Sequence, residues 1–261
     1  MQKKLDEMYN DDFYERQISG SYQSAKIYLG HLNKFLMIKS VADIGCGRGT
    51  WLKASKEFGA LTLIGFDGGW NSQENMIENS VTFKSCDLNH LETDGTEKLD
   101  LAISLEVAEH LEPSSALSFV KSLTDLSDVV LFGAAYKGQG GTNHINEQPP
   151  SYWASIFIEE FDFVPFDLFR PIFWGDDRIE YWYRQNTFLY VRKNSKAYDE
   201  IISKDEKYIS DIHLMDCIHP ELYGQKLEKL MQHSTISGSL GLVYSNIKNL
   251  IKLQLLSLQT K

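Results

Sequence analysis

Apolar residues recur along the middle of the chain in short runs, and segments with helical spacing separate these runs. The runs that predict strands are 41–44, 61–67, 81–87, 99–106, 128–135 and 186–193. The segments that repeat apolar residues on one helical face are 50–60, 114–126 and 153–161. Strands that alternate with helices in this way are typical of βαβ units. We therefore expect an α/β fold with a doubly wound, mostly parallel sheet.

The two ends of the chain differ from this middle part. Residues 1–35 are polar with scattered aromatics and predict a helical cap, so the core would span 36–195. Residues 196–261 predict a helical extension, in which 240–258 is a Leu- and Ile-rich amphipathic helix. The apolar face of that helix has to be covered. The core, a substrate lid or a second copy in a homodimer are three covers that the sequence leaves open.

Composition narrows the class of protein. The chain has 26 basic and 36 acidic side chains and a net charge of −10, which argues against non-specific nucleic-acid binding. Its apolar stretches are far shorter than the roughly 18 residues of a membrane span, and the N-terminus lacks the apolar region of a secretory signal. Three cysteines without C-x-x-C spacing fit free thiols in a reducing compartment. We expect a cytoplasmic enzyme that acts on a small or glycan-like substrate.

The turn after the first strand has the most informative sequence, DIGCGRGT over residues 43–50. Its three alternate glycines allow positive φ and a close approach of ligand to backbone. A dinucleotide-binding fingerprint requires a glycine where Thr50 stands. Asp43, two residues before the first glycine, suits a cationic ligand such as the ammonium of a methionine moiety, and it would repel a pyrophosphate. The turn therefore favours S-adenosylmethionine over NAD.

With this turn, the chain resembles the class I S-adenosylmethionine-dependent methyltransferases over roughly residues 38–193. The resemblance implies a seven-stranded Rossmann-like sheet. It also implies that Asp67 binds the ribose hydroxyls, that Asp87 accepts the adenine amino group, and that the end of the fourth strand lines the pocket. The cofactor-binding residues that it implies are Asp43, Gly45, Cys46, Gly47, Gly49, Asp67, Gly68, Asp87, Leu88, Leu105 and Glu106.

An acidic cluster follows the fourth strand. Glu106, Glu109 and His110 have i, i+3, i+4 spacing, which puts them on one side if the segment makes a helical turn. Two carboxylates so close repel each other unless a proton or a divalent cation neutralises them. Together with the histidine, they fit Mg²⁺, Mn²⁺ or Fe²⁺ better than a structural zinc site. A metal-free histidine base and a purely structural role are the alternatives.

The same spacing is similar to the metal-binding E-x-x-E-H of small-RNA 2′-O-methyltransferases and ubiquinone-pathway O-methyltransferases. This resemblance implies that Glu106, Glu109 and His110 are metal ligands. The small-RNA enzymes add a later histidine, and we expect His144, after the fifth strand, to be the fourth ligand here. Whichever of His110 and His144 is not a ligand is the candidate catalytic base.

Two segments, 140–153 and 174–186, combine polar side chains with aromatic rings such as Tyr152 and Trp153. Aromatic platforms with hydrogen-bonding groups suit a sugar. Together with the run FYERQISGS at 13–21, these segments resemble bacterial methyltransferases of surface-glycan and natural-product pathways. This implies O-methylation of a sugar, a glycan precursor or another small hydroxyl acceptor. A metal-independent methyltransferase of phenols or amines, an RNA methyltransferase and a non-catalytic cofactor-binding subunit are the competing hypotheses.

Overall fold

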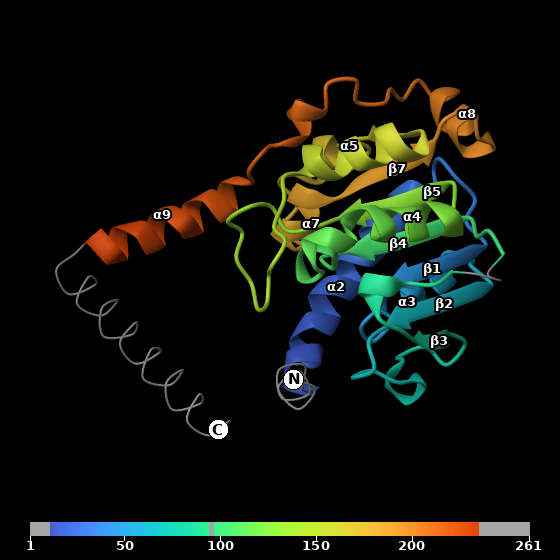
Figure 1. Cartoon of the computed structure of the whole chain (residues 1–261), viewed down its shortest axis with the longest axis horizontal. Helices are drawn as coiled ribbons and strands as arrows, with labels where there is room; N and C mark the ends of the chain where they lie inside the picture. The colour runs from blue at the N-terminus through green and yellow to red at the C-terminus, as the bar shows by residue number, and fades with distance from the viewer. Residues whose placement is uncertain (1–10, 94–96, 235–261) are drawn as a thin grey trace. The chain divides into compact units, whose positions relative to one another are not determined.

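A computed structural model describes residues 11–93 and 97–234 (Figure 1). Seven strands form one sheet in the order β3-β2-β1-β4-β5-β7-β6. Their bounds are β1 Ser40–Ile44, β2 Thr62–Asp67, β3 Thr82–Ser85, β4 Leu101–Leu105, β5 Val129–Gly133, β6 Phe163–Phe166 and β7 Phe188–Arg192. β1 to β5 run parallel, and β7 is antiparallel to both β5 and β6. The predicted doubly wound, Rossmann-like sheet is confirmed.

Helices cover both faces of the sheet (Figure 1). On one face, side chains such as Val41 pack with α2 (Asp11–Leu32) and α3 (Thr50–Glu57). On the other, side chains such as Ala42 pack with α4 (Ala116–Leu126) and α5 (Pro150–Phe161). Neighbouring residues of a strand point to opposite faces. Because both faces are buried, the strands are nearly continuous apolar runs, as a parallel sheet requires.

The strand β6 is absent from the runs that the sequence pattern predicts. It has only four residues, and one of them is Pro165. Proline cannot donate a ladder hydrogen bond and is therefore confined to sheet edges. β6 is the last strand of the sheet, next to β7 only, which is where a strand with an internal proline is tolerated.

Short helices complete the fold. The α-helices are α6 Arg170–Phe173, α7 Tyr181–Asn186, α8 Lys196–Ile202 and α9 Pro220–Ser234. The 3₁₀ turns are η1 Gln73–Asn75, η2 Leu88–His90, η3 Ala108–His110, η4 Pro113–Ser115 and η5 Ile212–Met215. None of the helices in the described ranges is long and apolar enough to cross a membrane. The three cysteines are free, in agreement with their spacing in the sequence.

The chain divides into two compact units after Cys217. α8 belongs to the first unit, where Ile201 is buried in the core under the sheet. α9 belongs to the second unit. The expected amphipathic helix over 240–258, and with it the lid or dimer contact, lies outside the described residues.

Candidate active site

The glycine turn between β1 and α3 has a left-handed backbone. Gly45, Gly47 and Gly49 have φ angles of 81°, 52° and 80°, where glycine avoids the steric penalty of a Cβ. Gly45 also permits a close approach, because a Cβ there would lie 2.3 Å from Cγ2 of Val107. The turn is therefore packed directly against the segment that follows β4.

Asp67, the last residue of β2, is fixed by this turn. Its carboxylate accepts hydrogen bonds from the amide of Gly47 at 2.8 Å and from that of Gly68 at 2.7 Å. The side-chain nitrogen of Asn71 lies 3.5 Å from the same carboxylate. Burial raises the pKa of Asp67, and these hydrogen bonds partly offset that rise. The carboxylate has further lone pairs with which to accept bonds from a pair of hydroxyls.

Asp43 and Cys46 are buried beside the turn. Burial, with a smaller contribution from the charge of Asp67, raises the pKa of Asp43 to about 8. Burial also raises the pKa of the Cys46 thiol, so Cys46 is not a reactive thiolate. A nearby positive charge would stabilise the ionised form of Asp43. The acid before the first glycine is thus placed to face a cation.

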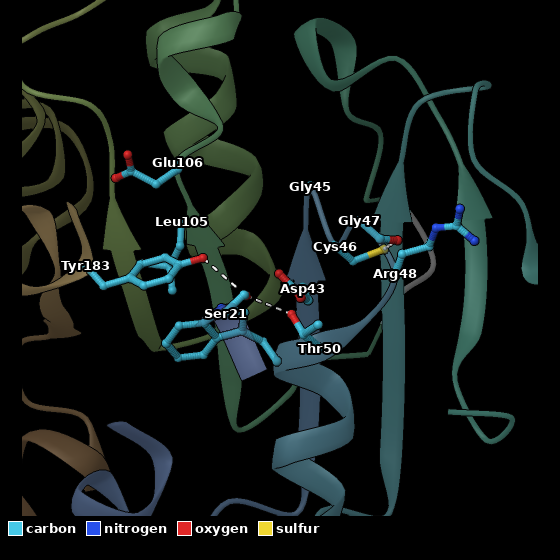
Figure 2. Close-up of a pocket in the computed structure, with 11 residues that line it drawn as sticks. Ser21, Asp43, Gly45, Cys46, Gly47, Arg48, Thr50, Leu105, Glu106 and Tyr183 are labelled. Carbon is cyan, nitrogen blue, oxygen red and sulfur yellow. Dashed lines mark hydrogen bonds between the residues drawn. The ribbon is translucent and has the colours of Figure 1, made fainter. Parts of the chain in front are cut away.

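A pocket opens at the carboxyl ends of β1 and β4 (Figure 2). Three hydroxyl groups from separate helices meet in it. Oγ of Ser21, from α2, lies 2.9 Å from Oγ1 of Thr50, from α3, and accepts a hydrogen bond from the Tyr183 hydroxyl of α7 at 3.3 Å. The lining residues are Ser21, Asp43, Gly45, Cys46, Gly47, Arg48, Thr50, Trp51, Leu105, Glu106 and Tyr183.

Part of the predicted cofactor set lies outside this lining: Gly49, Asp67, Gly68, Asp87 and Leu88. Asp87 caps η2, where its carboxylate accepts a hydrogen bond from the amide of Asn89 at 2.9 Å. That bond, with a contribution from His90, lowers the pKa of Asp87. The pocket thus contains Asp43, the residue predicted to face the methionine moiety, whereas Asp67 and Asp87, predicted for ribose and adenine, end β2 and follow β3 outside this lining.

Glu106 stands apart from the helical turn that the spacing suggested. Its φ of 57° is left-handed, which is uncommon for a residue other than glycine. Its two carboxylate oxygens accept hydrogen bonds from Gln139 at 2.9 Å and from Asn186 at 2.8 Å. Burial raises its pKa, and these two bonds offset part of the rise. The left-handed residue separates Glu106 from the turn η3, which begins only at Ala108.

Glu109 and His110 belong to η3 and have unsatisfied polar atoms. Among the described residues, neither carboxylate oxygen of Glu109 has a hydrogen-bond partner, and neither does Nδ1 of His110. Burial raises the pKa of Glu109 strongly, and the charge of Glu106 adds to the rise. The backbone groups of Glu109 and Ala135 lie near enough to offset a little of it, without a hydrogen bond of normal geometry. Burial and the neighbouring His144 lower the pKa of His110 to about 4, so its ring is neutral and one ring nitrogen keeps a lone pair.

His144 is brought to this pair by the loop after β5. The amides of Ile145 and Asn146 donate to the carbonyl of Glu109 at 2.9 and 3.0 Å. The His144 ring then lies perpendicular to that of His110, with 4.8 Å between the ring centres. Glu109, His110 and His144 each offer a ligand atom, and these atoms lie within 4.8 Å of one another. Three of the four predicted metal ligands therefore converge.

Glu147 fixes the orientation of His144. Its carboxylate lies 2.8 Å from Nδ1 of His144 and accepts hydrogen bonds from the amides of Gly138 and Gly140 at 2.7 and 2.6 Å. These bonds lower the pKa of Glu147 against the effect of its burial. With Nδ1 occupied, Nε2 of His144 is the nitrogen available to a ligand, in the arrangement by which metal-bound histidines are oriented.

The prediction that Tyr152 and Trp153 offer aromatic faces to a sugar is wrong for Trp153. Trp153 is 1% exposed and packs 5.4 Å from the ring of Phe132 in the core, because α5 turns it toward the sheet. Asn146 is also buried, with its side chain 3.5 Å from the carbonyl of Ala108. Tyr152 remains partly exposed. The loop thus serves mainly to place His144.

Sequence reasoning did not select Ser21, Arg48, Trp51 or Tyr183 as site residues, although all of them line the pocket. Ser21 and Tyr183 lie 162 positions apart in the sequence. Both do fall within runs that carry the resemblance to bacterial methyltransferases, FYERQISGS and IEYWYRQNT. A hydroxyl-bearing residue within such a run was the available signal.

No protein-family model matches the chain, and no curated protein sequence matches it. Solved structures do. Magnesium protoporphyrin IX methyltransferase from Synechocystis PCC 6803, with bound S-adenosylhomocysteine, is 19% identical with a TM-score of 0.50 over 74% of this chain and 100% of that one. A plantazolicin methyltransferase, in complex with a desmethyl-plantazolicin analogue and S-adenosylhomocysteine, is 13% identical with a TM-score of 0.52 over 72% and 91%.

A small-RNA methyltransferase is also similar, at 18% identity and a TM-score of 0.51, over 67% of this chain and 25% of that one. At these identities the likeness concerns the backbone. The strand order, the antiparallel β7 and these neighbours agree. The chain has the fold of the S-adenosylmethionine-dependent methyltransferases.

Proposed function

We propose that the protein is an S-adenosylmethionine-dependent O-methyltransferase. The observation that carries the proposal is the site at the glycine turn, where a buried acid, Asp43, lines a pocket and Asp67 is fixed by the amides of Gly47 and Gly68. An acidic lining suits the ammonium and sulfonium of the methyl donor, because a positive charge stabilises the ionised form of a buried acid such as Asp43. It would disfavour the pyrophosphate of a dinucleotide.

The cluster of Glu109, His110 and His144 fits a divalent cation. Unsatisfied, buried carboxylate oxygens and a neutral imidazole nitrogen are costly without a partner and are the donors that Mn²⁺, Fe²⁺ or Mg²⁺ take. A cation held there would make a coordinated hydroxyl easier to deprotonate. The chain's own contribution is to orient His144 through Glu147 and to keep His110 neutral. A histidine that is not a ligand would accept the acceptor's proton.

The methyl group would move directly from the sulfonium to the acceptor oxygen. The oxygen forms a bond to the methyl carbon, the carbon–sulfur bond breaks with its electron pair going to sulfur, and the hydroxyl proton leaves to a base. Gly45 packs against Val107, so the glycine turn and the η3 turn are neighbours. A donor bound at the first turn and an acceptor bound at the second would react faster, because binding fixes their relative orientation.

For the acceptor, we propose the hydroxyl of a sugar or glycan precursor. The support is the polar loop 140–148, with exposed Thr142 and Asn143 around His144. The net charge of −10 disfavours RNA. Phenols and amines are acceptors of the competing, metal-independent hypothesis.

A methyl-transfer screen tests this assignment. The full-length protein would be incubated with S-adenosylmethionine carrying a labelled methyl group, with Mn²⁺ or with EDTA, and with nucleotide sugars, glycosides, catechols, amines and short RNA. We expect the labelled methyl group to appear on a sugar oxygen. This transfer should stop in EDTA and return when Mn²⁺ is added. Transfer to a phenol or amine at full rate in EDTA would establish the alternative.

A further inference from the structure

The carboxylate of Glu106 lies outside the group of three clustered ligands. In the described part of the chain, the group whose ligand atoms lie within 4.8 Å of one another consists of Glu109, His110 and His144. Glu106 precedes them in sequence, yet its left-handed backbone interrupts the turn that would have placed all the acids on one side. Its amide is bonded to the carbonyl of Gly133 at 2.8 Å, which fixes that conformation.

Two side-chain amides orient the Glu106 carboxylate. Gln139 donates to one oxygen at 2.9 Å and Asn186 to the other at 2.8 Å. Asn186 also donates to the Oε1 atom of Gln139 at 3.0 Å, so the three side chains form a closed ring of hydrogen bonds. Each oxygen still has a lone pair free for a ligand.

Glu106 also lines the pocket, where those lone pairs can accept hydrogen bonds from a ligand. Glu106 and Asp43 are the two acidic residues among the described lining residues (Figure 2). The lining has one basic residue, Arg48, whose side chain extends away from both acids in Figure 2 and donates to Asn75 at 3.1 Å. Among the described lining residues, two carboxyl groups line the pocket while the basic side chain points away from them, which suits a ligand that carries a positive charge.

We propose that Glu106 binds the ammonium group of the methionine moiety of the methyl donor and is not a metal ligand. The inference rests on the proposed function, because it needs that donor in the pocket. It divides the acidic motif into two parts, in which Glu106 serves the cofactor and Glu109 serves the ion. Gln139 and Asn186 act as positioning residues for Glu106.

Paired variants separate the two roles. Glu106→Gln and Glu109→Gln each replace a carboxylate by an amide of the same shape. The full-length proteins would be titrated by calorimetry with S-adenosylhomocysteine and with 5′-methylthioadenosine, which has no amino-acid group. Binding of Mn²⁺ would be followed by electron paramagnetic resonance.

For Glu106→Gln we expect S-adenosylhomocysteine to bind roughly 10- to 100-fold more weakly, since a charge-assisted bond is lost. Its affinities for 5′-methylthioadenosine and for Mn²⁺ should stay unchanged. Glu109→Gln should show the reverse, with Mn²⁺ binding lost and S-adenosylhomocysteine binding kept. Glu106→Asp keeps the charge and should retain more affinity for S-adenosylhomocysteine than Glu106→Gln, provided that thermal denaturation shows both variants folded.

Loss of Mn²⁺ affinity in Glu106→Gln, with or without a change in S-adenosylhomocysteine binding, would overturn the inference. So would an unchanged preference for S-adenosylhomocysteine over 5′-methylthioadenosine in that variant. A wild-type protein that binds neither nucleoside would instead refute the proposed function.

Discussion

Asp67 and Glu109 are both buried acids near the ends of central strands, but their surroundings differ. Asp67 is 5% exposed and accepts hydrogen bonds from two backbone amides, whereas Glu109 is 0% exposed and its oxygens have no partner among the described residues. A carboxylate fixed by amides is prepared to accept further bonds from neutral hydroxyls. A buried carboxylate without them is destabilising unless a proton or a cation joins it. The first environment suits a nucleoside, and the second suits an ion.

Neutralising Asp67 tests the environment that suits a nucleoside. In Asp67→Asn, one oxygen becomes an amide that faces the N–H of Gly47 or Gly68 as donor against donor. We expect the free energy of unfolding to fall by about 2–3 kcal/mol, and the affinity for S-adenosylhomocysteine to fall roughly 100-fold. Thermal denaturation and calorimetry measure both. Unchanged affinity in a folded variant would contradict the role of Asp67.

The glycine turn offers a test with a matched control. Gly45→Ala puts a Cβ 2.3 Å from Val107 in a left-handed residue and should cost about 2–4 kcal/mol of stability, together with cofactor binding. Gly138→Ala has a similar φ of 86°, yet its Cβ would meet nothing within 4 Å. The control should lose only about 1 kcal/mol. Equal losses in the two variants would show that the approach of Val107 is unimportant.

A substitution at Glu147 tests the proposed ion site. Glu147→Gln removes the negative charge beside Nδ1 of His144 and leaves the three clustered residues in place. We expect Mn²⁺ to bind 10- to 100-fold more weakly, in the range seen for outer-shell partners. Affinity for S-adenosylhomocysteine should not change. The idea fails if Glu147→Gln binds Mn²⁺ as tightly as the wild type does.

The pH dependence of stability should carry the signature of Glu109. Burial raises its folded-state pKa above the ordinary 4.5, so the folded protein holds a proton that the unfolded chain releases. Stability without metal should therefore fall as pH rises from about 4.5 toward the raised pKa, by at most about 1.4 kcal/mol per pH unit. Asp43, with its pKa raised to about 8, acts in the same direction.

Glu109→Gln removes one of these contributions. The variant should lose less stability than the wild type between pH 5 and pH 8, and near pH 8 its melting temperature should be higher by about 2–4 °C. Melting curves in EDTA at several pH values test this. Parallel pH profiles for the two proteins would mean that Glu109 is not the group responsible.

The smallest effect is expected at the hydroxyl groups of the pocket. Ser21→Ala removes the bonds to Thr50 and Tyr183 and should weaken S-adenosylhomocysteine binding about fivefold, equivalent to about 1 kcal/mol. Ser122→Ala is the control, because Ser122 bonds to the carbonyl of Leu91 on the other face of the sheet. It should change the melting temperature without changing affinity. An equal loss of affinity in both variants would indicate a general loss of structure.

Local pattern predicted most of the fold. The strand expected at 41–44 is observed as Ser40–Ile44, since a buried parallel strand leaves a continuous apolar run. The sequence pattern does not predict the strand Phe163–Phe166, because a four-residue edge strand with an internal proline has little periodic signal. Trp153 was assigned to the surface because neighbouring polar residues dominated the segment, whereas the helix turned it inward.

The site was predictable only where it is local. The glycine turn and its acid lie within eight residues, so their association is visible in the sequence. The direction of the Glu106 side chain depends on a left-handed backbone angle and on Gln139 and Asn186, which are distant in sequence. Spacing alone therefore grouped Glu106 with Glu109, although in the structure Glu109 clusters with His110 and His144 and Glu106 lies outside that cluster.

Calorimetric competition between S-adenosylhomocysteine and NAD on the full-length protein tests the central claim most directly. We expect saturable heat with S-adenosylhomocysteine, a roughly 100-fold weaker affinity in Asp67→Asn, and no heat with NAD at the same concentrations. Heat with NAD and none with S-adenosylhomocysteine would contradict it.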